Sequence, residues 1–72
     1  MKTIEKVGTF NGTIIYHYNF TNKNGVEIQC TKYLFSVNGL PVYVNAKADK
    51  DKKIGAKVIY DLGYDGSRWV LI

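Results

Sequence analysis

The sequence predicts an all-β fold, a small barrel or orthogonal sandwich of six mostly antiparallel strands in one domain over residues 1–72. Composition is the first reason, because Val, Ile and Thr number 19 and aromatic residues ten, whereas Ala, Leu, Glu and Met together number only ten; the first two groups favour strands. Turn dipeptides are the second. Asn-Gly pairs occur at 11–12, 24–25 and 38–39, and an Asp-Gly pair at 65–66. Such pairs tolerate the positive φ angles of tight hairpin turns.

The spacing of these dipeptides sets the number of strands. The turns lie 13, 14 and 27 residues apart, and a charged stretch at 49–53 divides the longest interval. Five turns therefore separate six expected strands. The first strand is expected to end at the turn at 11–12.

The second expected strand covers residues 13–21 and alternates regularly. Its even-numbered residues from 14 to 20 are apolar or aromatic, and His17 lies among the odd-numbered polar ones. This period of two is typical of a strand with one apolar face. We expect the aromatic side chains to share that face with Ile14 and His17 to lie on the polar face.

The third expected strand changes the phase of its alternation. Ile28 and Cys30 are apolar at even positions, whereas Tyr33 and Phe35 are apolar at odd positions. A β-bulge at residues 31–32 would restore the register and bend the strand. Strong bending of a central strand is how a short sheet closes into a barrel or folds over itself.

The fourth and fifth expected strands alternate through residues 40–46 and 54–62, with the apolar face at even positions. If they form a hairpin, Tyr43, Lys47 and Lys57 should project from one outward face, with Ile59 nearby. A short helix is the alternative for residues 45–53, where Ala and Lys are frequent.

A domain of this size is marginally stable by itself. Ordering 72 residues costs roughly 110 kcal/mol at about 1.5 kcal/mol per residue, and burial must nearly match this. One Cys excludes an intrachain disulfide, and the absence of a Cys/His cluster excludes a structural zinc site. We therefore expect either marginal stability or help from a partner chain, self-association included.

The residues for nucleophilic catalysis are scarce. The candidates are two Ser, one Cys and one His, and a nucleophile needs a base and an orienting group. Cys30 is expected in the apolar core and His17 on a solvated strand face. No motif for a metal, a nucleotide or another cofactor is present. The sequence therefore predicts a binding protein rather than an enzyme, without cofactors.

Half of the positive charge falls in one short segment. Five of the ten basic residues lie within residues 47–57, against two Asp, in a chain of net charge +4. Cations beside an exposed aromatic side chain on a curved sheet are the arrangement that binds single-stranded nucleic acid. The candidate binding residues are Tyr43, Lys47, Lys50, Lys52, Lys53, Lys57 and Arg68. The alternative is an ordinary solvated loop, because charged residues at strand edges also prevent aggregation.

Two partial resemblances to known families follow from these segments. Residues 54–61, IGAKVIYD, and 65–70, DGSRWV, resemble the Gly-x-x-Val-x-Tyr-Asp and Asp-Gly-x-x-Trp patterns of bacterial SH3-type cell-wall-binding domains. In size, basicity and its Tyr-rich strands, the chain is similar to small OB-type single-strand binders of phages and mobile elements. The barrel is accordingly expected to be OB-like or SH3-like.

Three functions remain as hypotheses. The first is binding of single-stranded DNA or RNA. The second is a protein-interaction module or small phage or mobile-element regulator, homodimeric or with a foreign partner, that uses the apolar segment at 69–72 at a sheet edge. The third is cell-wall binding. The N-terminus lacks the apolar run of a signal peptide, and the longest apolar stretch is too short for a membrane span, so we expect a cytoplasmic protein that does not bind membranes.

Overall fold

The computed structural model describes residues 3–72, and within them five antiparallel strands form one sheet. The strands are β1 (Glu5–Thr21), β2 (Glu27–Val37), β3 (Leu40–Ala46), β4 (Lys57–Tyr64) and β5 (Trp69–Leu71). Their order across the sheet is β3-β2-β1-β4-β5. The all-β, mostly antiparallel prediction is confirmed. Six strands were expected, but the described residues form five. A barrel or sandwich was expected, but the strands form a single curved sheet that does not close.

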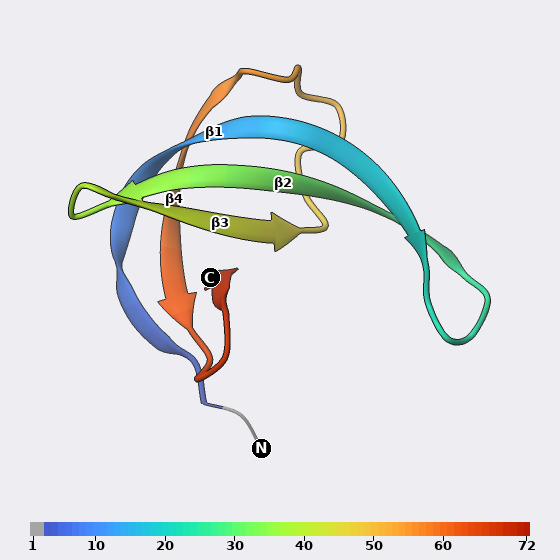
Figure 1. Cartoon of the computed structure of the whole chain (residues 1–72), viewed down its shortest axis with the longest axis horizontal. Coiled ribbons are helices and arrows are strands. Elements are labelled where there is room, and N and C mark those ends of the chain that lie inside the picture. Colours follow the sequence, from blue (N-terminus) through green and yellow to red (C-terminus); the bar gives the residue numbers. More distant parts are fainter. Residues whose placement is uncertain (1–2) are drawn as a thin grey trace.

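The long strand β1 organises the sheet because it has different partners along its length. Its C-terminal half pairs with β2 and its N-terminal half pairs with β4, so the chain arches through the middle of the molecule (Figure 1). The sheet curls until the edge strands β3 and β5 lie near each other. No ladder joins these two edges among residues 3–72, so the curled sheet stays open between them.

The turn expected at Asn11-Gly12 is wrong, and this accounts for the missing sixth strand. Both residues are extended within β1. Gly12 is needed there for space, because a Cβ on it would lie 2.5 Å from Cε1 of the Phe35 ring. The aromatic ring thus packs directly against the backbone of β1, and two expected strands become one.

The β-bulge expected at Thr31-Lys32 does not occur there; a bulge lies in β1 instead. The register of β1 against β2 shifts between Ile14 and Tyr16, so the extra residue belongs to β1, while residues 31 and 32 pair without interruption. After this β-bulge, His17 faces the buried Thr31, and the aromatic side chains of β1 turn to the opposite, outer face. The bulge therefore reverses the faces predicted for this segment.

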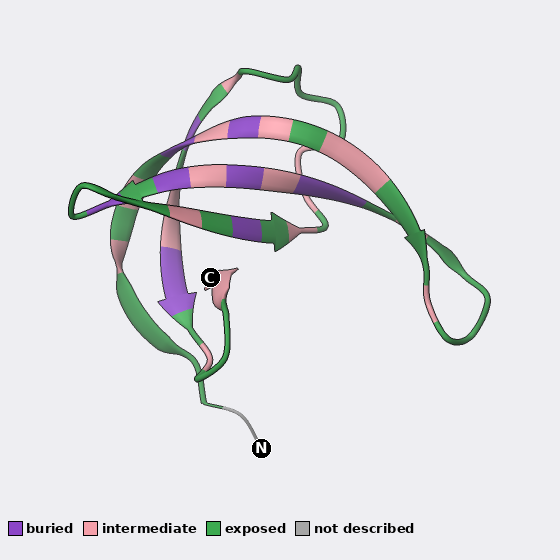
Figure 2. Cartoon of the chain, viewed as in Figure 1, coloured by how far each residue is buried: buried purple, intermediate pink, exposed green. Residues whose placement is uncertain are grey.

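The core lies inside the curve of the sheet and draws on four strands (Figure 2). It consists of Ile14, Tyr33, Phe35, Val37, Val44, Val58 and Leu62, with Phe10, Val42, Ala46, Ala56, Tyr60, Trp69 and Leu71 packed around them. The alternation predicted for residues 40–46 and 54–62 is confirmed in part, since Val44, Val58 and Leu62 are buried whereas Tyr43 and Ile59 are exposed. Leu40 and Ile54, which were expected on the apolar face, are exposed, and β4 begins at Lys57 rather than at residue 54.

The remaining connections follow the turn chemistry of the sequence. Asn38 and Gly39 both have positive φ, 52° and 82°, as a two-residue hairpin turn of type I′ requires. The predicted turns at Asn24-Gly25 and Asp65-Gly66 are confirmed, with a positive φ at each Gly. Residues 47–56 form an irregular loop between β3 and β4, so the alternative helix at 45–53 is wrong.

No helix occurs in the described chain, so none is available to cross a membrane.

Candidate nucleic-acid interface

The outer face of the β1-β2-β3 part of the sheet carries a stripe of aromatic side chains. Tyr16, Tyr18 and Phe20 follow one another at every second residue of β1, with ring centroids 5.8 Å and 6.5 Å apart. Tyr16 is 42% exposed and Phe20 41% exposed. Exposed aromatic side chains gathered on one face make it a candidate binding surface.

A lysine connects this stripe to β3. The Nζ atom of Lys32 on β2 lies 5.8 Å from the ring centroid of Tyr16 and 5.1 Å from that of Tyr43. Cations within about 6 Å of an aromatic face are attracted by its quadrupole. The result is a cation held between two exposed rings, since Tyr43 is 56% exposed. We call Tyr16, Tyr18, Phe20, Lys32 and Tyr43 the aromatic patch.

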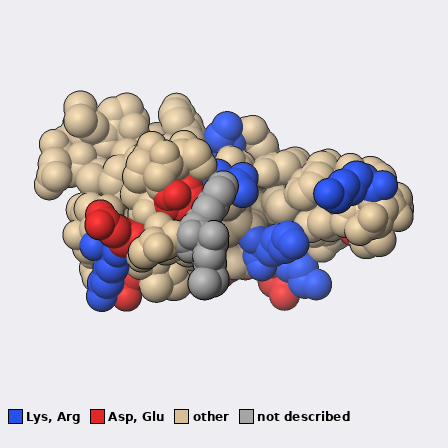
Figure 3. Space-filling view, turned by 90° about the horizontal axis from the view of Figure 1, so that it is seen from below, with Lys and Arg blue, Asp and Glu red and all other residues tan. Residues whose placement is uncertain are grey.

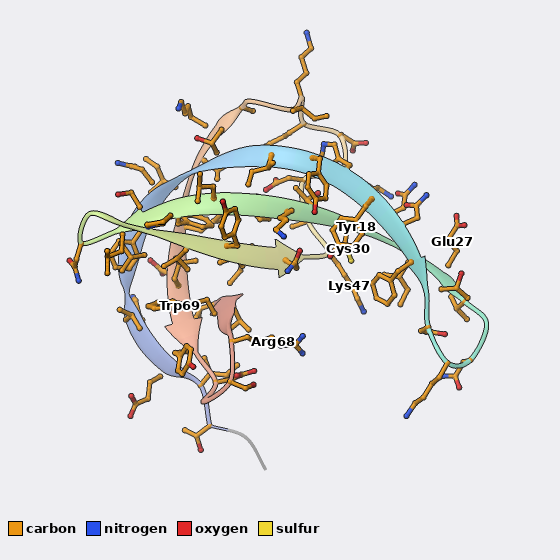
Figure 4. The ribbon with its side chains drawn as sticks, in the orientation of Figure 1. Tyr18, Glu27, Cys30, Lys47, Arg68 and Trp69 are labelled. Atoms are coloured by element: carbon orange, nitrogen blue, oxygen red, sulfur yellow. The ribbon has the colours of Figure 1, made fainter. Side chains whose placement is uncertain are left out.

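The middle of the aromatic patch is fixed by polar contacts. The hydroxyl group of Tyr18 donates a hydrogen bond of 2.9 Å to Oδ1 of Asn45 on β3. Burial and the neighbouring buried thiol of Cys30 raise the pKa of Tyr18, so this tyrosine stays a neutral donor. Figure 4 shows Tyr18 and Cys30 together where β1 and β2 pair. Three strands are thus joined beneath the exposed rings.

Two of the residues predicted as binding residues lie on this outer face, although not by the expected route. Strands β3 and β4 do not pair, so the hairpin that would bring Tyr43 and Lys57 together does not form. The register instead sets Tyr43, Leu34, Thr13 and Lys57 in one row across four strands. Lys57 lies at the far end of that row and donates a hydrogen bond of 3.2 Å to Thr13 Oγ1.

The loop that carries the other predicted lysines is tied to the inner side of the sheet. The Asp49 carboxylate accepts hydrogen bonds from the hydroxyl groups of Tyr33, at 2.6 Å, and Tyr60. Burial by itself raises the pKa of Asp49, but hydrogen bonds from the two tyrosines and the Lys52 ammonium group hold it below its ordinary value. The same carboxylate raises the pKa of Tyr60 to about 12.

The loop lysines share a cleft with acidic residues. A cleft of about 800 Å³ lies between the loop and β2. Its charged lining comprises Lys47, Lys50 and Lys52 with Glu27, Asp49 and Asp51. The lining therefore carries three basic and three acidic residues, so its formal charge cancels, and the Lys52 ammonium group lies 3.4 Å from Oδ1 of Asp49. Lys53 is exposed in the same loop but is not part of this lining.

Arg68 lies apart from the loop. It belongs to the turn between β4 and β5, whereas Lys57 begins β4, so the length of that strand separates them (Figure 4). Its Nε atom is 3.8 Å from Oδ2 of Asp65. On the face seen in Figure 3, basic side chains form separate groups rather than one continuous patch. The structure thus brings Tyr43 and Lys57 to one face. Lys52 of the loop lines a cleft together with Lys57, whereas Arg68 lies elsewhere.

Comparison of the chain with protein-family models, characterised proteins and solved structures finds no match.

The aromatic patch contains four residues that the sequence reasoning did not select, namely Tyr16, Tyr18, Phe20 and Lys32. Three of them were expected on the apolar face of their strand. One signal in the sequence could have found them, because the doublet Ile14-Ile15 interrupts the alternation just before Tyr16. An extra residue there moves everything after it to the other face.

The described residues contain no group of three or more His, Cys, Asp or Glu side chains that could hold a metal ion.

Proposed function

We propose that the protein binds single-stranded nucleic acid on the outer face of its sheet. The observation that carries the proposal is the Lys32 ammonium group between the exposed rings of Tyr16 and Tyr43. Aromatic rings stack on bases of any identity, at about 1 to 3 kcal/mol per base, and nearby cations attract the phosphates. A face on which aromatic rings and a cation lie side by side therefore suits single-stranded nucleic acid, which is flexible, anionic and carries planar bases.

The strand order supports an OB-like assignment of the fold. An OB-fold is a partly open, five-stranded barrel that binds oligonucleotides over strands 2 and 3 and the loops that join strands 1 to 2 and 4 to 5. Here five strands run in the order β3-β2-β1-β4-β5, with the two edges close together. In such a fold the ligand would cross Lys32 and Tyr43, with Lys23 in one flanking loop and Arg68 in the other.

Fluorescence anisotropy with a labelled oligothymidine at low salt tests the proposal. We expect binding that weakens steeply as salt increases, because bound phosphates release counterions. Tyr43→Ala should weaken binding about fivefold or more, the equivalent of one lost stacking contact. Tyr43→Phe keeps the ring and should bind like the unmodified protein. Absence of binding at micromolar protein concentration would overturn the proposal.

A pair of lysine substitutions distinguishes the aromatic patch from the basic loop. Lys32→Ala removes the cation between the rings, whereas Lys53→Ala removes an exposed cation of the 47–56 loop. The two variants have the same net charge. If the ligand crosses the aromatic patch, the first should weaken binding severalfold more than the second. The reverse order would assign the site to the loop.

The second candidate function is protein interaction, including homodimerisation. Strands β3 and β5 support it, because each lies at an edge of the sheet and has one side that pairs with no other strand among the described residues. Exposed apolar side chains support it too, since Leu40 is 67% exposed and Ile59 68%. Light scattering after size-exclusion chromatography measures self-association, and a strict monomer at all concentrations removes the homodimer.

The third candidate function is cell-wall binding. Its support is the β4-β5 hairpin with its Asp-Gly turn and Trp69. Failure to sediment with peptidoglycan would overturn that third candidate.

A further inference from the structure

A cleft of about 650 Å³ lies where the middle of β1 meets the start of β4. The side chains that give it polar character include Asn11 of β1, Lys57 of β4 and Lys52 of the 47–56 loop, and Val58 and Ile59 add apolar surface. We call this space the Lys57 cleft. Among the residues that the structure describes, no Asp or Glu lines it, whereas the cleft between the loop and β2 has as many acidic as basic residues. The Lys57 cleft therefore favours an anion.

Both ammonium groups of the Lys57 cleft keep protons for a ligand. Lys57 donates to Thr13 Oγ1 at 3.2 Å, and the Lys52 ammonium group lies 3.4 Å from Oδ1 of Asp49. An ammonium group has three protons, so each of these contacts leaves two of them, and the Asn11 side chain adds an amide donor. The Asp49 carboxylate offsets part of the charge of Lys52. We therefore expect Lys57 to be the main anchor of an anion.

A second cleft, of about 410 Å³, adjoins the first, because the two share three lining residues, Lys57 among them. It continues across β1 to the β2-β3 hairpin, where Leu34 and Pro41 line it, and within residues 3–72 it also has no acidic residue in its lining. On the other side of Lys57, Ile59 is 68% exposed. A ligand whose anionic group contacts Lys57 thus meets apolar surface on either side.

We infer that the Lys57 cleft binds a phosphate monoester, the terminal phosphate group of a nucleotide. At neutral pH such a group carries a charge of about −1.5 to −2 and three strong acceptor oxygens. The two ammonium groups and the Asn11 amide group supply donors for these oxygens. The attached nucleoside then lies on the apolar surface beside Lys57.

The phosphate group has two possible sources, a free nucleotide or the phosphorylated end of a strand bound on the aromatic patch, and only the second rests on the proposed function. Lys57 and Tyr43 occupy one row across four strands. Neighbouring strands are about 4.8 Å apart, so this row spans about 14 Å along the sheet. A strand that stacks on Tyr43 therefore reaches Lys57 after a short stretch of nucleotides.

Titration with thymidine monophosphate, followed by nuclear magnetic resonance, tests the Lys57 cleft, with thymidine as the matched control. We expect the backbone amide resonances of residues 57–59 and the side-chain amide resonances of Asn11 to shift with the monophosphate and not with thymidine. Lys57→Ala should weaken this binding about fivefold, as loss of one hydrogen bond implies. Lys53→Ala removes the same charge from a residue that lines neither cleft, and its binding should be unchanged. Absence of these shifts, equal shifts with thymidine, or equal weakening by both substitutions would overturn the inference.

Fluorescence anisotropy of oligothymidine with and without a terminal phosphate distinguishes the two sources, with the label at the opposite end. If a strand end occupies the Lys57 cleft, the terminal phosphate should tighten binding about fivefold, and Lys57→Ala should abolish that gain. If thymidine monophosphate binds and the terminal phosphate makes no difference, the cleft takes a free nucleotide. Oligothymidine that binds the aromatic patch while thymidine monophosphate leaves the cleft unshifted would overturn this inference and leave the proposed function intact.

Discussion

At the scale of single residues, small groups determine where large ones can pack. Gly12 lets the Phe35 ring lie against the backbone of β1, and Gly8 on the same strand faces Phe10 less tightly, with the nearest ring carbon 3.3 Å from where a Cβ would be. Both glycines are extended, so neither is required for its backbone conformation. The two glycines differ in the space left for a side chain, which is smaller beside the Phe35 ring at Gly12 than beside the Phe10 ring at Gly8.

Substitution of these two glycines tests that explanation. Gly12→Ala should destabilise the fold by about 1 to 3 kcal/mol, as overpacking of a filled core does, because a methyl group 2.5 Å from Cε1 of Phe35 displaces a fully buried ring. Gly8→Ala should cost clearly less, since its neighbour needs to move only a few tenths of an ångström. Urea unfolding of both variants measures this, and equal losses would show that space at Gly12 is not limiting.

At the scale of elements, the alternation of apolar and polar residues predicted the strands correctly where a strand is regular. The prediction of which face a side chain occupies failed where a bulge, defined by the pairing with a neighbouring strand, shifts the alternation. Within the predicted strands at 40–46 and 54–62, the alternation from residue 42 and from residue 57 onward could be read alone because each of these strands keeps one face toward the core. The phase change between Cys30 and Tyr33 was visible, but it does not mark a bulge. Strand β2 alternates without interruption, so Cys30 lies on the outer face opposite Tyr18 and Tyr33 lies on the inner face. The extra residue belongs to β1, at Ile15, where no phase change in β2 could reveal it.

The candidate site was predictable only in part, for the same reason. Tyr43 was selected because its own strand alternates simply. The aromatic residues of β1 were assigned to the wrong face because their direction is set by a bulge upstream of them, in the pairing with β2. Counting charge along the chain also selected the loop lysines, whereas the folded loop sets acidic neighbours against them.

Deletion of one residue distinguishes the two positions of the bulge. Removing Ile15 should leave every later side chain on its present face, because the strand then pairs regularly, and the cost should be about 1 to 3 kcal/mol. Removing Lys32 takes a residue from β2, which pairs on both sides, so one part of that strand must reverse its faces. We expect the Lys32 deletion to be unfolded by circular dichroism where the Ile15 deletion is folded. A folded Lys32 deletion would restore the bulge to residues 31–32.

At the scale of the whole molecule, a curled but open sheet needs ties between its two halves. The β2-β3 side and the β4-β5 side meet through β1 and through the 47–56 loop. Asp49 forms the central tie because its carboxylate accepts from Tyr33 on β2 and from Tyr60 on β4. Its φ of 58° lies in the left-handed region, which Asp and Asn tolerate better than most residues.

This tie predicts how stability depends on pH. The lowered pKa of Asp49 means that its contribution is present above the ordinary pKa of an aspartate and is lost as pH falls through the folded value. Tyr60 behaves in the opposite sense. Its pKa rises from 10 to about 12, so its contribution is present below pH 10 and is lost as pH rises toward 12. Stability should therefore fall at both ends of the pH range.

Asp49→Asn separates this tie from the general titration of the protein. Asparagine keeps the left-handed backbone conformation but cannot titrate, and hydrogen bonds to a charged group are stronger than those to a neutral one. We expect the variant to be about 1 to 3 kcal/mol less stable at neutral pH, with the gap to the unmodified protein narrowing below roughly pH 4 as Asp49 gains its proton. Asp51→Asn, in the same loop without these tyrosine contacts, should cost little. Thermal unfolding across pH measures all three proteins. A gap that stays constant into acid would mean that the charge of Asp49 does not join the two halves of the sheet.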